Sequence, residues 1–284
     1  MEKAENVEKV GKAGKYENIL IVSDLDNTFL SFEKTVVERN LRAIEAFEKE
    51  GGRFTFSSGR NHQTILNAVP MAAQIANAPG GMVNGAYLYD FRKQESMLPV
   101  YMKKETALQV ARFVHTWDPT LGIRISTKDG IGVAVSNAYI QQEFVPDILG
   151  SSYYWLPPET WTGEEWYKIV VRGESDLLDR LRAACEKEFG PCYEYVKSSG
   201  TYFEIQTKCC TKARVIACLR EYYALRGSVP KIYACGDYEN DLPMLMAADV
   251  AVCPSNAHED VKKVADLCLC SCSDGVIADL IEKL

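Results

Sequence analysis

The segment NILIVSDLDNT at residues 18–28 joins a short apolar run to a cluster of acidic and polar side chains. Residues 18–23 are typical of a buried β-strand that ends where the turn-prone acidic residues begin. Asp24 and Asp26 therefore follow the carboxyl end of a predicted strand, where ligands bind in parallel sheets. One such carboxylate can attack a substrate while the other transfers a proton. A polar turn that happens to contain two aspartates would explain the same residues.

Further strands and helices alternate along both ends of the chain. The predicted strands are 53–57, 81–83, 231–235, 249–253 and 266–270, and the predicted helices cover 37–47, 61–68, 211–226, 239–247 and 257–265. A strand–helix–strand order predicts a parallel sheet with helices on its faces. The ends of the chain therefore predict one α/β, Rossmann-like core.

The middle of the chain has a different pattern. It contains all four tryptophans, strand-like segments at 122–126, 132–136, 167–172 and 201–206, and helical segments at 104–117 and 174–189. This pattern predicts an α+β cap at 87–205, inserted into a core formed by 1–86 and 206–284. A length of 284 residues agrees with two domains.

Composition excludes several classes of protein. A formal net charge of -7 gives no attraction to nucleic acid or to an anionic membrane surface, so an anionic substrate would need a local cation or metal. There is no apolar run long enough for a transmembrane helix, and the charged first residues do not resemble a secretory signal. We expect a cytoplasmic protein that is a monomer or weak homodimer.

Ten cysteines include the adjacent Cys209 and Cys210 and the alternating Cys268, Cys270 and Cys272. Neither arrangement matches a zinc-binding pair of CxxC segments. We expect buried, reduced thiols, with a metal or redox role as the weaker alternative.

Three more polar groups follow predicted strands. Ser58, Gly59 and Arg60 follow residues 53–57, where a hydroxyl and helix-start N–H groups can bind phosphate or merely cap a turn. Lys212 lies near a helix start, against the helix dipole, which suggests pairing with carboxylates or phosphate. Asp237 and Asp241 follow the strand at 231–235, and such oxygen ligands suit Mg²⁺, although acids at a helix start are also favoured by the dipole. Together the four groups supply what phosphoryl transfer through an aspartyl-phosphate needs.

These segments resemble the four motifs of the haloacid dehalogenase (HAD) superfamily, in the same order. DLDNT at 24–28 resembles DxDxT, Ser58 before Gly-Arg resembles motif two, Lys212 in TKA resembles motif three, and GDYEND at 236–241 resembles motif four. An insert between motifs two and three, with Asn84 in VNGAYLYD, is similar to the Cof-like sugar-phosphate phosphatases. That group usually has Gly after the second Asp; Asn27 here resembles sucrose-phosphate phosphatases instead.

The resemblance implies a Mg²⁺-dependent phosphatase acting on a small-molecule phosphate ester, with a sugar phosphate as the expected substrate. Asp24 would attack phosphorus and Asp26 would act as acid and then base. The implied Mg²⁺ ligands are Asp24, the backbone carbonyl of Asp26, and Asp237, with Asp241 in support. The implied phosphate or substrate ligands are Ser58, Gly59, Arg60, Asn84, Lys212, Asn240 and Asn256.

The predicted cap would set leaving-group specificity. Its polar and aromatic candidates are Arg124, Lys168, Lys197, Glu204, Trp155 and Trp161, although surface or packing roles are open for each. Two other functions also remain open. A phosphosugar mutase would return the phosphoryl group to a sugar, and a non-catalytic protein would only bind phosphate.

Overall fold

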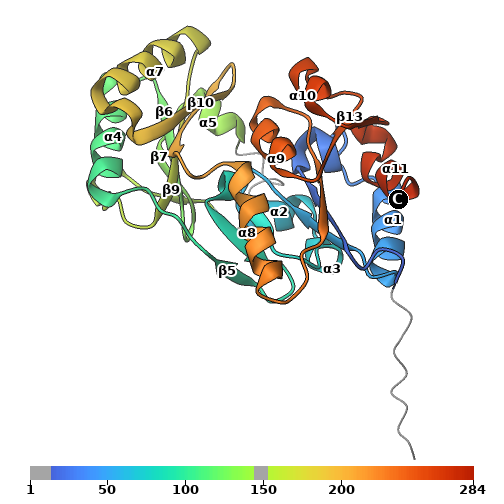
Figure 1. The fold of residues 1–284 in the computed structure, drawn as a ribbon. Coiled ribbons are helices and arrows are strands. Elements are labelled where there is room, and N and C mark those ends of the chain that lie inside the picture. Colours follow the sequence, from blue (N-terminus) through green and yellow to red (C-terminus); the bar gives the residue numbers. More distant parts are fainter. Residues whose placement is uncertain (1–13, 144–152) are drawn as a thin grey trace, which may run out of the picture.

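The computed structural model describes residues 14–143 and 153–284, and a five-stranded parallel sheet forms its core (Figure 1). The strand order is β14-β13-β12-β1-β2, and every neighbouring pair is parallel. The strands are β1 (Ile19–Ser23), β2 (Arg53–Phe56), β12 (Lys231–Cys235), β13 (Val250–Pro254) and β14 (Leu267–Leu269). Strands from both ends of the chain therefore share one sheet, which confirms the predicted α/β core.

Helices cover both faces of this sheet because alternate side chains of each strand point in opposite directions. Ile21 belongs to the hydrophobic cluster with α1 (Glu38–Lys49) and α11 (Val276–Glu282). Leu20 and Val22 belong to the cluster with α8 (Lys212–Ala224), α9 (Leu242–Ala247) and α10 (Glu259–Val264). Apolar side chains on both faces of β1 explain why it reads as a continuous apolar run.

The middle of the chain forms a second sheet, which lies beside the core in Figure 1. Its order is β10-β11-β9-β6-β7-β8, antiparallel except for the β7–β8 pair. The strands are β6 (Gly122–Thr127), β7 (Gly130–Val135), β8 (Tyr153–Trp155), β9 (Trp166–Arg172), β10 (Tyr193–Ser199) and β11 (Tyr202–Thr207). Two helices, α4 (Lys104–Trp117) and α7 (Ser175–Phe189), share its hydrophobic cluster, and α5 (Ala138–Glu143) follows β7.

A small third sheet corrects the expectation for residues 81–83. We predicted a parallel strand of the core there, but β3 (Gly80–Met82) pairs antiparallel with β4 (Tyr87–Asp90), which pairs with β5 (Glu95–Met97). Val83 and Asn84 have left-handed backbone angles that turn the chain back after β3. Gly81 nevertheless borders the parallel sheet in the predicted direction, through a parallel bridge to Ser57 and a hydrogen bond from the Ser58 N–H to its carbonyl at 2.9 Å.

The third sheet also bears on where the cap begins. Tyr87 and Tyr89, within the range predicted as cap, pack in the same hydrophobic cluster as the parallel sheet. We therefore propose that the cap begins after β5 rather than at residue 87. Two short helices, α2 (His62–Ala68) and α3 (Ala72–Ile75), precede this sheet.

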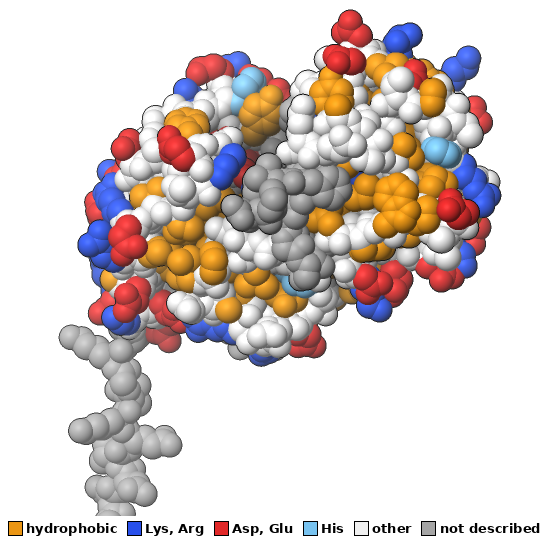
Figure 2. All heavy atoms as spheres, turned by 180° about the vertical axis from the view of Figure 1, so that it is seen from behind, with side chains coloured by type: hydrophobic (Ala, Val, Ile, Leu, Met, Phe, Trp, Pro, Cys, Tyr) orange, Lys and Arg blue, Asp and Glu red, His pale blue; other side chains and the backbone are white. Residues whose placement is uncertain are grey.

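The described surface can be set beside the sequence expectations on charge, membrane spans and cysteines. Acidic and basic side chains are interspersed over the face in Figure 2, with no single basic patch on that face. Across residues 14–143 and 153–284, no helix combines the length and apolarity that a membrane span requires. All ten cysteines are free thiols, and Cys268, Cys270 and Cys272 range from exposed to buried.

Candidate active site

Asp24 lies at the carboxyl edge of the parallel sheet, at the floor of a cavity of about 670 Å³. β1 and β12 are neighbours in register, Ser23 beside Cys235, so the residues that follow these strands meet at one edge. Asp24 and Asp237 both line the cavity, and cap residues line its opposite wall. β1 also separates β2 from β12, so the cavity lies where successive connections run in opposite directions, as in other open α/β sheets.

Lys212 lies behind this floor: its side chain is 1% exposed, contacts Asp24 and is not among the residues that line the cavity. The Nζ atom lies 2.5 Å from Asp24 Oδ1 and 2.5 Å from Asp241 Oδ1. Burial opposes the charged form, but the two carboxylates outweigh burial and raise the pKa of Lys212 above its usual value. Lys212 is therefore a protonated donor, held in place against the nucleophile candidate.

Asp241 braces the loop that carries Asp237. Its Oδ2 accepts hydrogen bonds from the backbone N–H groups of Asp237, at 3.0 Å, and Tyr238, at 3.2 Å, while its Oδ1 faces Lys212. Asp237 Oδ1 accepts from the Thr28 hydroxyl at 2.9 Å. Both oxygens of Asp241 are thus engaged, which suits a supporting role, whereas Asp237 faces the cavity.

The three carboxylates of Asp24, Asp237 and Asp241 could hold a metal ion, because oxygen atoms of all three lie within 4.8 Å of one another. When ionised, they carry two negative charges more than Lys212 neutralises. Burial and repulsion from Asp241 raise the pKa of Asp24 well above its usual value, and raise that of Asp237 to about 6. A divalent cation would relieve this repulsion, and carboxylate oxygens are the ligands that Mg²⁺ prefers. The residues therefore fit the predicted metal.

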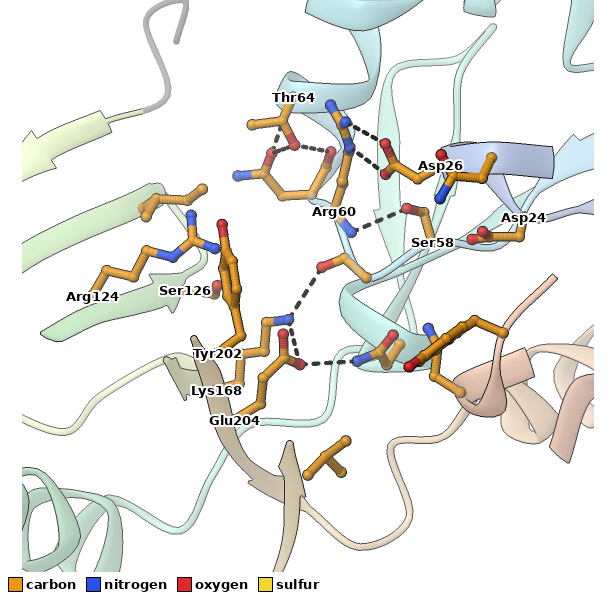
Figure 3. A pocket seen from close by; sticks show the side chains of 18 of the residues that line it. Asp24, Asp26, Ser58, Arg60, Thr64, Arg124, Ser126, Lys168, Tyr202 and Glu204 are labelled. Carbon is orange, nitrogen blue, oxygen red and sulfur yellow. Dashed lines mark hydrogen bonds and ion pairs between the residues drawn. The ribbon is translucent and has the colours of Figure 1, made fainter. Parts of the chain in front are cut away.

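Asp26 is held in an ion pair with Arg60 (Figure 3). Arg60 Nε donates to Asp26 Oδ2 at 2.9 Å and Nη2 donates to Oδ1 at 2.7 Å, and Lys34 Nζ lies 3.3 Å from Oδ1. Burial favours the neutral acid, but the hydrogen bonds and charge of Arg60 outweigh it and lower the pKa of Asp26. In this conformation Asp26 is ionised. We predicted Arg60 as a phosphate ligand, and here it contacts the predicted acid.

The departure at Asn27 has a structural explanation. Asn27 has a φ of 58°, a left-handed conformation that Gly adopts freely and that Asn tolerates better than most residues. The Asn256 amide donates to the Asn27 carbonyl at 3.0 Å and accepts from the Cys272 N–H at 2.9 Å. Asn256, predicted to bind substrate, therefore steadies the acidic loop and is not among the residues that line the cavity.

The other predicted phosphate ligands lie together on the cavity wall. Ser58, Gly59, Asn84 and Asn240 all line it. The Ser58 hydroxyl accepts a hydrogen bond from the N–H of Arg60 at 3.2 Å. Asn84 lies beside Gly59, but its side-chain amide donates to Glu204 and Gln206 on β11 of the second sheet.

Of the cap candidates, three line the cavity and three do not. Arg124, Lys168 and Glu204 line it. Lys197 instead pairs with Asp179 on α7, at 2.7 Å. The remaining two are Trp155, which is 62% exposed, and Trp161, which is packed in the cap cluster.

Sequence reasoning missed several lining residues of the cap wall. Tyr153 and Tyr202 line the cavity beside Arg124, whose Nη1 donates to the Tyr153 hydroxyl at 3.0 Å, and Ser126, Ile131 and Val196 complete this wall. These residues belong to β-strands whose alternate side chains face the cavity. Alternation within β6 and β11 was the available signal, but it does not show which face of the cap sheet meets the core.

Comparison with known proteins places this geometry among characterised folds. A family model described as haloacid dehalogenase-like hydrolase matches residues 21–281. A Bacillus subtilis 5-amino-6-(5-phospho-D-ribitylamino)uracil phosphatase is 26% identical over 257 residues, 87% of this chain and 88% of that protein. A crystal structure from Thermotoga maritima has a TM-score of 0.80 at 23% identity, covering 95% of this chain and 97% of that one. A HAD subclass IIB sugar phosphatase has a TM-score of 0.77 at 18% identity, covering 93% and 98%.

Proposed function

The chain belongs to the haloacid dehalogenase-like hydrolases, and we propose that it is a Mg²⁺-dependent phosphatase of small phosphorylated metabolites with Asp24 as nucleophile. One observation carries this proposal. Asp24 and Asp237 line the floor of a cavity whose opposite wall comes from the cap, and the buried ammonium of Lys212 contacts Asp24 from behind that floor. That floor offers an attacking oxygen and positive charge for a phosphoryl group at the same point.

In the proposed reaction, a carboxylate oxygen of Asp24 attacks phosphorus and the bond from phosphorus to the leaving oxygen breaks. Asp26 gives a proton to that oxygen, and the phosphoryl group stays on Asp24 as an aspartyl-phosphate. Asp26 then takes a proton from water as the water oxygen attacks phosphorus; the bond from phosphorus to Asp24 breaks, which releases inorganic phosphate and restores the Asp24 carboxylate. Because Asp26 is ionised while paired with Arg60, it gains its proton only after that ion pair opens.

Hydrogen-bond donors of this chain would stabilise the negative charge on the transferred phosphoryl group. Lys212, already protonated, and the Ser58 hydroxyl would hold phosphoryl oxygens. The carboxylates of Asp24 and Asp237, with the backbone carbonyl of Asp26, would hold Mg²⁺. When bound, the ion supplies further positive charge beside the phosphoryl oxygens.

A sugar or polyol phosphate is the substrate class that we propose. The cavity of about 670 Å³ lies within the usual range for small-molecule sites and is too large for phosphate alone. Its cap wall presents the hydroxyl groups of Ser126, Tyr153 and Tyr202 and the guanidinium group of Arg124, which suit a polyhydroxylated leaving group. Relatives named as phosphatases of a sugar and of a phosphoribityl compound support this class.

Phosphate release from a panel of sugar, polyol, nucleotide and aryl phosphates, with Mg²⁺ or with chelator, tests the proposal. We expect Mg²⁺-dependent release that is strongest for one or a few sugar or polyol phosphates. Isomerisation of a sugar phosphate without phosphate release, in the presence of a bisphosphate activator, would instead identify a mutase. Folded protein that releases phosphate from none of the compounds would reject the phosphatase.

A further inference from the structure

Lys168 links the cap to the phosphate-binding loop formed by Ser58, Gly59 and Arg60. Its Nζ donates to Glu204 Oε2 at 2.9 Å and to the carbonyl oxygen of Gly59 at 3.3 Å (Figure 3). The side chains of Lys168 and Glu204 are 5% and 10% exposed. A buried ion pair of the cap thus bonds directly to a backbone carbonyl of the core.

Neighbouring carbonyls of this loop are held from within the core. The N–H of Asn84 donates to the Ser58 carbonyl at 2.9 Å, and the N–H of Val83 donates to the Arg60 carbonyl at 2.9 Å. Between them, the Gly59 carbonyl points to Lys168. The cap therefore supplies the hydrogen bond that completes three successive anchored carbonyls.

Orientation of the Gly59 carbonyl determines where the next N–H points. The peptide bond is trans, so its C=O and the N–H of Arg60 point in opposite directions. That N–H donates to the Ser58 hydroxyl at 3.2 Å, on the cavity side of the loop. Lys168 thus sets the peptide plane that presents the hydroxyl and N–H groups proposed to receive phosphate.

Asn84 provides a second link between the cap sheet and the loop. The Asn84 amide donates to Glu204 Oε2 at 3.3 Å and to Gln206 Oε1 at 3.2 Å. Asn84 also lies against Gly59, where an added Cβ would come within 3.1 Å of Asn84 Oδ1. Gly59 therefore lies between two side chains. Lys168 bonds to its carbonyl oxygen, and Asn84, which donates to Glu204, packs against its Cα.

We propose that Lys168 and Glu204 are positioning residues that organise the phosphate-binding loop only when the cap is seated on the core. This positioning role rests on the proposed phosphatase function, because only a phosphatase substrate would bring a phosphate group to the loop. It differs from leaving-group recognition in one measurable way. A positioning residue changes binding of phosphate itself and affects every leaving group alike, whereas a specificity residue affects one leaving group more than another.

The test compares Lys168→Met with Lys197→Met in the full chain, both with Mg²⁺. Inorganic phosphate binding is measured by calorimetry, and kcat and KM are measured for two substrates with different leaving groups. Lys197 is the matched control, because it is also a cap lysine in an ion pair but contacts Asp179 and Ser175 rather than the core. We expect Lys168→Met to weaken phosphate binding roughly tenfold or more, as for loss of a hydrogen bond from a charged group, and to lower kcat by a similar factor for both substrates. Lys197→Met should leave both unchanged.

A double variant separates positioning from misfolding. Lys168→Met removes the ammonium group that faces the buried Glu204 carboxylate, whereas Lys168→Met/Glu204→Met removes both charges and should fold as well as wild type. We expect the double variant to keep the phosphate-binding defect. Normal phosphate affinity in the folded double variant, or a defect confined to one leaving group, would overturn the proposal. Wild type that binds phosphate but hydrolyses no ester would reject the phosphatase while the binding comparison still decides the positioning role.

Discussion

Lys212 and Lys168 are both almost completely buried, yet their surroundings differ in charge. Lys212 lies between Asp24 and Asp241, with Asp237 close by, so negative charge exceeds positive charge at the core floor. Lys168 faces one carboxylate, that of Glu204, together with a neutral backbone carbonyl. The first lysine belongs to a cluster with more negative than positive charge, and the second faces a single carboxylate.

This difference separates the proposed reaction centre from the residues proposed to position it. Buried charges are costly unless they are paired, so a surplus of carboxylates persists only where a ligand compensates it. A balanced pair needs no ligand, and its ordered geometry can hold a neighbouring loop instead. The comparison therefore assigns ion and phosphate chemistry to the Lys212 end of the cavity and orientation to the Lys168 end.

We expect the largest loss of turnover from replacing Asp24, the proposed nucleophile. Asp24→Asn keeps the shape of the side chain but removes the attacking carboxylate, and we expect turnover to fall at least about 10⁴-fold. Steady-state phosphate release measures the loss, and circular dichroism and thermal melting check that the fold is retained. Residual activity near that of wild type would remove Asp24 from the nucleophile role.

The second largest loss of turnover should come from removing the ammonium group of Lys212. Lys212→Met should lower turnover roughly 10³-fold, because phosphoryl charge loses a preorganised donor in a water-poor site. In chelator it should also lower the free energy of unfolding by about 3 kcal/mol, since Asp24 and Asp241 are left without their cation. Denaturant unfolding measures the second effect. If Lys212→Met is as stable as wild type in chelator, the excess negative charge of the carboxylate cluster does not destabilise the folded state.

The core end of this comparison was predictable from sequence and the cap end was not. Asp24, Ser58 and Asp237 each follow a strand, and parallel pairing brings the carboxyl ends of strands to one edge whatever the details of packing. Contact between Lys168 and Gly59 joins residues 109 positions apart across two sheets. It depends on how the cap sits on the core, which no local pattern encodes.

Two further differences have equally physical causes. Arg60 was predicted to bind phosphate, but its fork of donors matches the carboxylate of Asp26 in bidentate fashion, which depends on loop shape rather than on spacing. The strand predicted at 81–83 keeps one parallel bridge to Ser57 but pairs along its length with β4, because the chain reverses at Val83 and Asn84, which both adopt a left-handed conformation. Asn tolerates that conformation without requiring it, so its presence alone did not predict the reversal.

Mg²⁺ binding should have a moderate effect on stability, and it should distinguish the acidic cluster around Lys212 from the ion pair of Lys168. At a Mg²⁺ concentration of about 100 times its dissociation constant, wild type should gain about 2.7 kcal/mol of stability by binding linkage. Asp237→Asn removes a proposed ligand and should lose most of that gain, whereas Lys168→Met should keep it because its pair lies outside the acidic cluster. Thermal melting with and without Mg²⁺ measures both. Equal stabilisation of wild type and Asp237→Asn would place the ion elsewhere.

The smallest effect should come from Lys197, which completes the comparison with a lysine that is only partly buried. Its side chain is 22% exposed, and Asp179, its partner, is 56% exposed, so water screens the pair and stabilises either charge when the other is removed. Lys197→Met should therefore change the free energy of unfolding by no more than about 0.5 kcal/mol. Denaturant unfolding beside Lys168→Met measures the contrast directly. Since both lysines pair with one carboxylate in the same cap, equal destabilisation would mean that burial and the contact with the core do not distinguish them.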